Sequence, residues 1–152
     1  PWTRNPEIAV LDACRELGTA FVAFSPVGRG FLAGGVSDPS ALADGDFRKD
    51  MPRFQGEAFA ANLKLYQAFA ALAAEAGCTP AQLCLAWLKQ KDPIIVSIPG
   101  TTSPAHMIEN AKADAVVLSP ETMAKLEALV NDKTVTGPRY APAMQASIDT
   151  EG

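Results

Sequence analysis

The chain lacks the features that mark several functional classes. Its 13 lysines and arginines are outnumbered by 17 aspartates and glutamates, and no basic cluster occurs, which excludes a nucleic-acid-binding surface. No apolar run approaches the roughly twenty residues that span a bilayer. The first residues, PWTRNPE, do not resemble a signal peptide. We therefore expect a cytoplasmic protein with neither a nucleic-acid partner nor a membrane partner.

Residues with reactive side chains are equally sparse. The three cysteines have no metal-ligand spacing and fit small buried side chains in a reducing compartment; they are Cys14, Cys78 and Cys84. The sequence has one histidine and contains no Walker loop or Gly-x-Ser-x-Gly motif. Tyr66 and Tyr140 lack the lysine and aspartate partners that lower the pKa of a tyrosine proton donor. We expect no metal site and no catalytic residue in this chain.

A repeated pattern marks the starts of helices. At four places a residue with a capping side chain precedes a proline: Asn5-Pro6, Thr79-Pro80, Ser103-Pro104 and Ser119-Pro120. The capping oxygen accepts from an unpaired N–H group, and proline at the first helical position loses no hydrogen bond. The pattern predicts helices at 5–17, 79–91, 103–113 and 119–131, and apolar periodicity predicts one more at 57–76.

Only two segments are typical of strands. Residues 20–24 and 94–98 are short, apolar and rich in β-branched or aromatic side chains, as expected for parallel strands covered on both faces. Residues 26–56 form a long loop typical of a functional lid, and the polar tail at 132–152 is expected to be extended. Two parallel strands do not make a stable sheet in water, so we expect further strands from an upstream segment.

Two turns about seventy-five residues apart carry the strongest functional signal. AFSPVGRGFLAG, at 23–34, and IPGTTSPAHMIEN, at 98–110, each join a short apolar strand to a turn of glycine, proline and small polar residues. The second turn runs directly into a helix start. Turns of this kind present backbone N–H groups to a phosphate. The sequence therefore predicts that both turns contact a phosphate-containing ligand.

Together the two turns resemble the halves of the nicotinamide-nucleotide site of the aldo-keto reductases. The resemblance runs from Trp2-Thr3-Arg4 to Gly137-Pro138-Arg139-Tyr140, and GCTPAQLCLAWL is similar to the bacterial and plant branch that includes the perakine-reductase-like enzymes. It implies an α/β fold, the (β/α)8 TIM barrel, with residues 1–152 as the C-terminal half of one domain. Residues 20–24 and 94–98 would be the last two strands, and residues 119–131 the extra helix beside the barrel.

The resemblance also implies a role for each turn. Phe24 would stack on the nicotinamide ring. The pyrophosphate would lie on the turn that follows, made of Ser25, Pro26, Val27, Gly28, Arg29 and Gly30. Arg48 would fold over the phosphates as a clamp. The ribose phosphate and the adenine would lie on the second turn and its helix, against Gly100, Thr102, His106, Glu109 and Asn110. The implied cofactor is NADPH, with NADH as the alternative.

Without the resemblance, several of these residues have simpler interpretations. Phe24 would be a core aromatic residue, and His106 a solvated helix residue. Glu109 would pair with Lys112, three residues further along the same helix. Arg48 would be a solvated loop residue. The resemblance favours cofactor binding for the two turns and leaves the two interpretations of Arg48 evenly balanced.

By this resemblance the chain is the cofactor-binding part of an NADPH-dependent reductase that converts aldehydes and ketones to alcohols. The family's catalytic Asp, Tyr, Lys and His would lie upstream of Pro1, so we expect the chain alone to be inactive. Its partners would be a nicotinamide nucleotide, a small carbonyl substrate and an N-terminal barrel half. A non-catalytic nucleotide-binding or interaction subunit of the same fold is the alternative, and a fragment without its own function is a third interpretation.

Overall fold

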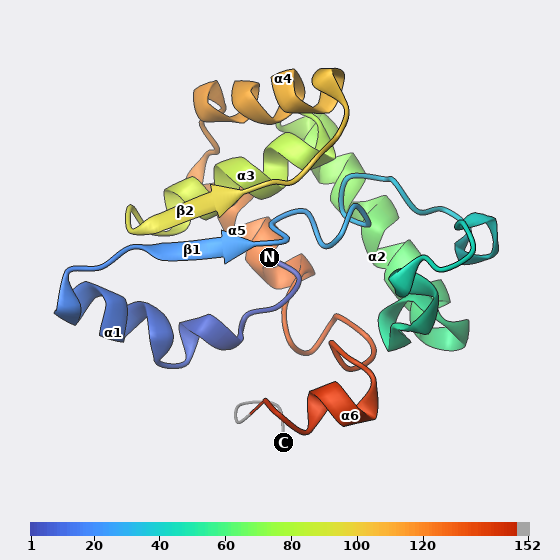
Figure 1. Ribbon diagram of the computed structural model, residues 1–152. Helices are drawn as coiled ribbons and strands as arrows, with labels where there is room; N and C mark the ends of the chain where they lie inside the picture. Colours follow the sequence, from blue (N-terminus) through green and yellow to red (C-terminus); the bar gives the residue numbers. More distant parts are fainter. Residues whose placement is uncertain (149–152) are drawn as a thin grey trace.

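Two short parallel strands organise the chain. In the computed structural model, which describes residues 1–148, β1 (Phe21–Phe24) lies beside β2 (Ile95–Ile98), and both strands run in the same direction (Figure 1). Phe21 is opposite Ile95, and Phe24 is opposite Ile98. These are the only strands among the described residues. The predicted parallel pairing is confirmed, and the chain between the strands contains two long helices.

The predicted helix starts are confirmed where a capping side chain is present. α3 (Pro80–Lys91) begins with a capping box: the Gln82 N–H donates to Thr79 Oγ1 at 3.2 Å, and the Thr79 N–H donates to Gln82 Oε1 at 3.1 Å. α4 (Pro104–Lys112) and α5 (Pro120–Leu129) each begin after a serine whose side chain accepts from the N–H group three residues further on. The helix predicted from apolar periodicity is α2 (Gly56–Glu75).

Three segments differ from the sequence-based expectation. The helix expected at 5–17 is divided into a 3-10 turn, Asn5–Glu7, and α1 (Val10–Leu17), because Ala9 has a φ of −151° that no helix accommodates. The long loop contains three short 3-10 turns: Pro39–Ala41, Phe47–Asp50 and Pro52–Phe54. In the tail, where extended chain was expected, residues Pro142–Gln145 form α6 with proline at its start; residues 149–152 lie outside the described part.

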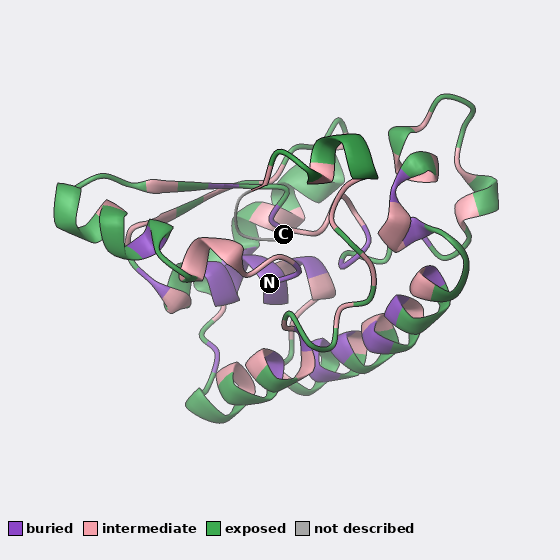
Figure 2. Ribbon diagram, turned by 90° about the horizontal axis from the view of Figure 1, so that it is seen from below, coloured by how far each residue is buried: buried purple, intermediate pink, exposed green. Residues whose placement is uncertain are grey.

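The core lies between the helices and one face of the sheet. Buried residues follow one side of α2 (Figure 2): Phe59, Asn62, Leu65, Phe69, Leu72 and Ala73. Trp2 packs on Phe31 with ring centroids 4.4 Å apart. Full burial of such a side chain stabilises the fold by roughly 1.5–3 kcal/mol. In the described part, no single helix is long and apolar enough to cross a membrane; α2 and α3 reach that length and composition only together, bent by 78°.

The other face of the sheet is apolar and uncovered. Val22 and Val96 are opposite each other, as are Phe24 and Ile98, and all four side chains are 50–54% exposed. Alternation along a strand puts these four on one face. The sequence suggested strands covered on both faces, but residues 1–148 leave these four side chains about half exposed. Each strand also has only one neighbour within that part of the chain, so each keeps one unpaired edge.

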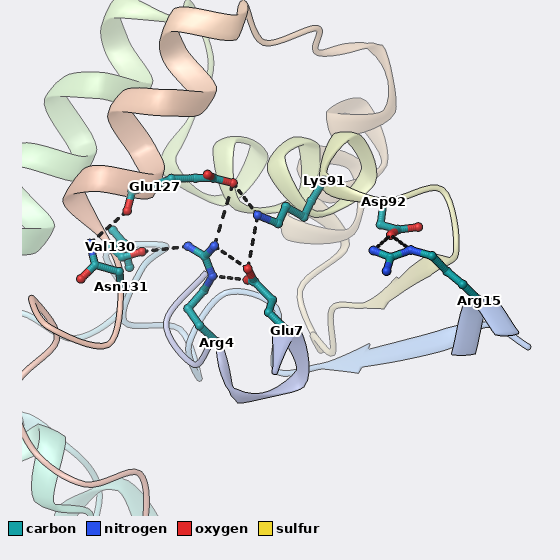
Figure 3. A network of polar contacts seen from close by, with 8 residues as sticks. All are labelled: Arg4, Glu7, Arg15, Lys91, Asp92, Glu127, Val130 and Asn131. Carbon is teal, nitrogen blue, oxygen red and sulfur yellow. Dashed lines mark hydrogen bonds and ion pairs between the residues drawn. The ribbon is translucent and has the colours of Figure 1, made fainter. Parts of the chain in front are cut away.

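A network of charges fixes the N-terminal segment against α3 and α5 (Figure 3). Arg4 donates to Glu7 at 2.7 Å and to the Val130 carbonyl at 3.3 Å, and Lys91 bridges Glu7 and Glu127 at 3.3 and 2.7 Å. These contacts join three segments that are distant in sequence. They hold in place the chain that leads to Trp2 on one side and to α1 on the other.

A second set of contacts fixes the start of β2. The Ile94 N–H donates to Asp92 at 3.1 Å, and the Arg15 side chain donates to the same carboxylate at 2.7 Å. The Ile94 N–H and Arg15 together hold the pKa of Asp92 below its usual range. Asp92 is buried, so these donors compensate for its lost hydration. α1 is thereby tied to the turn that precedes β2.

Asn62 anchors the segment that follows α5. It is fully buried on α2, its amide donates to the Thr136 carbonyl at 2.9 Å, and its oxygen accepts from the Thr136 N–H at 2.9 Å. The amide also donates to the Arg53 carbonyl at 3.3 Å. One side chain therefore holds two loops that have no regular structure of their own.

We expect Asn62→Ala to lower the free energy of unfolding by about 2 kcal/mol, because it removes the three hydrogen bonds that this buried side chain makes to the backbone of Thr136 and Arg53. Equilibrium urea unfolding measures the change. Lys64→Ala, on the exposed side of the same helix, is the matched control and should change stability by less than about 0.5 kcal/mol. Equal stability of the two variants would show that Asn62 is not an anchor.

Candidate functional site

The loop after β1 is conformationally strained. Five of its residues have positive φ values: Ser25 (49°), Gly28 (60°), Arg29 (59°), Gly30 (86°) and Gly34 (80°). For a residue with a Cβ atom this conformation costs roughly 1–2 kcal/mol, and such strain is concentrated at functional sites. Ser25 and Arg29 are the only residues other than glycine with positive φ in the described part of the chain. The strain therefore points to this loop as a binding element.

The same loop leaves backbone donors unused. Within residues 1–148, the N–H groups of Val27, Arg29 and Gly30 donate to no protein acceptor, whereas the Gly28 N–H donates to the Ser25 carbonyl at 3.0 Å. Three consecutive residues with positive φ, Gly28, Arg29 and Gly30, turn the backbone sharply here, and unused N–H groups in such a turn suit an anion. The loop thus has the geometry expected for phosphate binding.

The loop after β2 offers a second set of donors. In the described structure the N–H groups of Gly100, Thr101 and Thr102 also donate to no protein acceptor. Ser103 then caps α4 by accepting from the His106 N–H at 3.4 Å. The positive end of the α4 dipole favours a negative charge at this point.

The two loops open into one groove, because the carboxyl ends of parallel strands lie at the same edge of the sheet. The groove has a volume of about 1260 Å³. It brings together most residues that the sequence predicted for the cofactor: Ser25, Pro26, Val27, Arg29, Gly30, Arg48, Gly100, Thr102, His106, Glu109 and Asn110. Phe24 and Gly28 instead line an adjoining cavity of about 120 Å³ that shares Ser25, Pro26 and Arg29 with the groove.

Arg48 supports the first loop directly. Its guanidinium donates to the Arg29 carbonyl at 3.1 Å and pairs with Asp46 at 2.6 Å. The hydrogen bonds from the Arg48 side chain, and then from its backbone N–H, lower the pKa of Asp46 to about 2. Arg48 is therefore not a fully solvated loop residue: it holds the strained turn and lines the groove beside it.

The helix residues of the second loop lie along the same groove. His106 is exposed at its edge, while Glu109 and Asn110 are half-buried one turn further along α4. Glu109 makes no ion pair with Lys112 in the described structure, and its carbonyl accepts from the Gln82 side chain at 3.1 Å. The simple pairing suggested by their sequence spacing is therefore not formed.

The structure adds residues that sequence reasoning missed. The Arg139 guanidinium lies 5.0 Å from the centre of the Phe24 ring, and Arg53 and Trp2 line the same small cavity. Arg139 belongs to the tail that was expected only to extend over the surface. The GPRY sequence at 137–140 was the one signal that could have indicated it. The described residues contain no cluster of three His, Cys, Asp or Glu side chains that could hold a metal.

A matched pair of glycine substitutions tests how tightly the first loop is packed. A Cβ atom at Gly28 would overlap the Trp2 indole, whereas one at Gly18 would meet nothing, although both residues have nearly the same positive φ. We expect Gly18→Ala to cost about 1–2 kcal/mol from backbone strain alone. Gly28→Ala should cost about 2–5 kcal/mol, because overpacking adds to that strain.

Thermal or urea unfolding of both variants gives the comparison. Equal losses of stability would show that the Trp2 indole does not pack against the turn at Gly28.

Comparisons with known proteins bear on the family and the fold of the chain. The sequence model of the Aldo/keto reductase family matches residues 1–131. The chain is 39% identical over 144 residues to aldo-keto reductase yakc [NADP(+)] from Schizosaccharomyces pombe, covering 95% of this chain and 42% of that protein. A crystal structure of the thermostable aldo-keto reductase Tm1743 with the inhibitor epalrestat matches 83% of this chain and 35% of its own, at 28% identity and a TM-score of 0.55. The chain thus spans about two-fifths of the length of the curated relative.

Proposed function

The chain belongs to the aldo/keto reductase family, and on that basis we propose that it binds NADPH in the groove between its two loops as part of a carbonyl reductase. Its two parallel strands and their helices form part of a (β/α)8 barrel. The fungal relative carries NADP(+) in its name, which supports this choice of nucleotide.

The observation that carries the proposal is the pair of unused donor sets at one edge of the sheet. Among the described residues, those with unused backbone N–H groups are Val27, Arg29 and Gly30 after β1 and Gly100 and Thr102 after β2, and all of them line one groove. An extended ligand with two separated phosphate groups satisfies both sets. NADPH is such a ligand, with a pyrophosphate and a ribose phosphate.

The proposal assigns a direction to the nucleotide. The exposed ring of Phe24, at the end of β1, would support the nicotinamide, which supplies a hydride to the substrate carbonyl carbon when bound there. The strained turn would bind the pyrophosphate, and Arg48 would keep that turn in shape. His106 would contact the ribose phosphate, and Asn110 would contact the adenine.

Protonation of the reduced oxygen is not assigned to this chain. In residues 1–148, Tyr66 points its hydroxyl at Gly34 beneath the first loop, and Tyr140 lies between Arg29 and Arg139. Within this range, neither tyrosine has a lysine and an aspartate beside it. We assign the proton donor to further barrel segments that would pair with the free edges of β1 and β2 and cover their exposed apolar face.

Cofactor selectivity tests the proposed nucleotide site. We expect NADPH to bind about ten-fold more tightly than NADH, because a hydrogen bond to a charged phosphate is worth roughly 1.5–3 kcal/mol. His106→Ala should remove most of this difference by weakening NADPH binding. Met107→Ala, at the exposed neighbour on α4 that does not line the groove, should leave both affinities unchanged.

Dissociation constants from cofactor fluorescence give the result. If His106→Ala weakens both nucleotides equally, or neither, His106 is a solvated helix residue and not the phosphate contact. If neither nucleotide binds the unsubstituted protein, the proposed function fails.

The location of the proton donor is tested by activity. We expect the 152-residue chain alone to oxidise NADPH with 4-nitrobenzaldehyde no faster than a blank without protein. The chain must be prepared free of host reductases, because a trace contaminant would mimic turnover. Turnover well above the blank would place the proton donor within this chain, and Tyr140→Phe would then be the first variant to examine.

A further inference from the structure

A row of alternating cations and aromatic rings crosses the nicotinamide end of the groove. The Arg29 guanidinium lies 5.6 Å from the Phe47 ring centre and 5.0 Å from that of Tyr140. Arg139 lies 5.0 Å from Tyr140 and 5.0 Å from Phe24. Two arginines from segments more than a hundred residues apart are therefore held close together by the rings between and beside them.

These two arginines have no carboxylate partner in the described part of the chain. Arg4, Arg15 and Arg48 each form an ion pair with an aspartate or glutamate. Arg29 instead donates to the sulfur of Met51, and Arg139 has only its ring contacts. Burial lowers the pKa of Arg29 below its ordinary value; Tyr140 acts against this shift, and the nearby charge of Arg139 acts with it. A negatively charged ligand would relieve this uncompensated charge.

The cavity of about 120 Å³ between them has the chemistry that such a ligand needs. All of its charged lining residues are arginines, namely Arg29, Arg53 and Arg139, and no aspartate or glutamate lines it. Its remaining wall includes the apolar side chains of Trp2, Phe54 and Leu88. Phe24 lies at the same cavity, so its occupant would be beside the proposed nicotinamide position.

Arg139 is held at this cavity by contacts of its own segment. The Arg53 side chain donates to the Gly137 carbonyl at 3.0 Å, and Asn62 pairs with both backbone groups of Thr136. The backbone is thus fixed shortly before Arg139, while the guanidinium is placed by Phe24 and Tyr140. A fixed guanidinium of this kind can form two parallel hydrogen bonds with a carboxylate.

We propose that Arg139, together with Arg29, binds a carboxylate of the substrate, so that the enzyme prefers small apolar aldehydes or ketones that carry a carboxylate group. This inference rests on the proposed function for the identity of the reaction, but the anion site itself does not. The same chemistry could bind a phosphate of the nucleotide, and the experiment separates the two sources.

Benzoate and benzamide are suitable probes, because they have the same shape and differ in charge. Isothermal titration calorimetry of the chain should give benzoate an affinity about ten-fold higher than that of benzamide. Arg139→Gln should reduce this ratio to near one. Arg139→Lys, which keeps the charge but loses the planar guanidinium, should give an intermediate ratio. Lys64→Gln removes one positive charge from the exposed side of α2 and should leave the ratio unchanged.

The NADPH affinity of the same variants shows whether Arg139 binds a substrate carboxylate or a phosphate of the nucleotide. The proposal expects Arg139→Gln to weaken benzoate binding more than NADPH binding. A larger loss for NADPH would assign Arg139 to a nucleotide phosphate and overturn the proposal, as would a wild-type protein that does not distinguish benzoate from benzamide. If the wild type binds no NADPH but keeps a benzoate preference that Arg139→Gln removes, the proposed function fails and the carboxylate site stands.

Discussion

Parallel pairing of β1 with β2 is the constraint on which the other functional features depend. The pairing puts the ends of both strands at one edge, so two loops that are distant in sequence face the same groove. The register matters as much as the direction. A slip of one residue in β1 would exchange its two faces and turn Phe24 from the open side toward the helices. The position proposed for the nicotinamide would then lose its aromatic support.

The strain in the first loop is balanced by contacts with Arg48, with the N-terminal segment and within the core. Arg48 holds the Arg29 carbonyl, the Trp2 indole fills the space beside Gly28, and Phe31 packs on Trp2 from within the core. Donors that are already oriented in the free protein need not be ordered when a ligand binds. Arg48, further along the same long loop, and the N-terminal segment would therefore contribute to the proposed binding through the shape of the turn at 25–30.

Features set by local chemistry could be predicted from the sequence, and features set by distant contacts could not. The starts of α3, α4 and α5 depend on a cap and a proline that are adjacent in sequence, and the turn after β1 depends on its own glycines. The break at Ala9 has no such local signal. The anchoring of Thr136 by Asn62 joins residues 74 positions apart, and the contact of Arg139 with Phe24 spans even more of the chain. These depend on packing, which no periodicity reveals.

The open sheet also affects how this chain behaves in solution. The segments FVAF and IVSI contain no charged residue and no proline, which are the usual safeguards of an exposed strand edge. An unpaired edge beside an apolar face is a template for another strand, whether from a barrel segment or from a second copy of the same chain. At high concentration, growth of the sheet between copies would compete with formation of the barrel. Partnering of these two strands would therefore govern the solubility of the chain as well as the shape of the proposed nucleotide site.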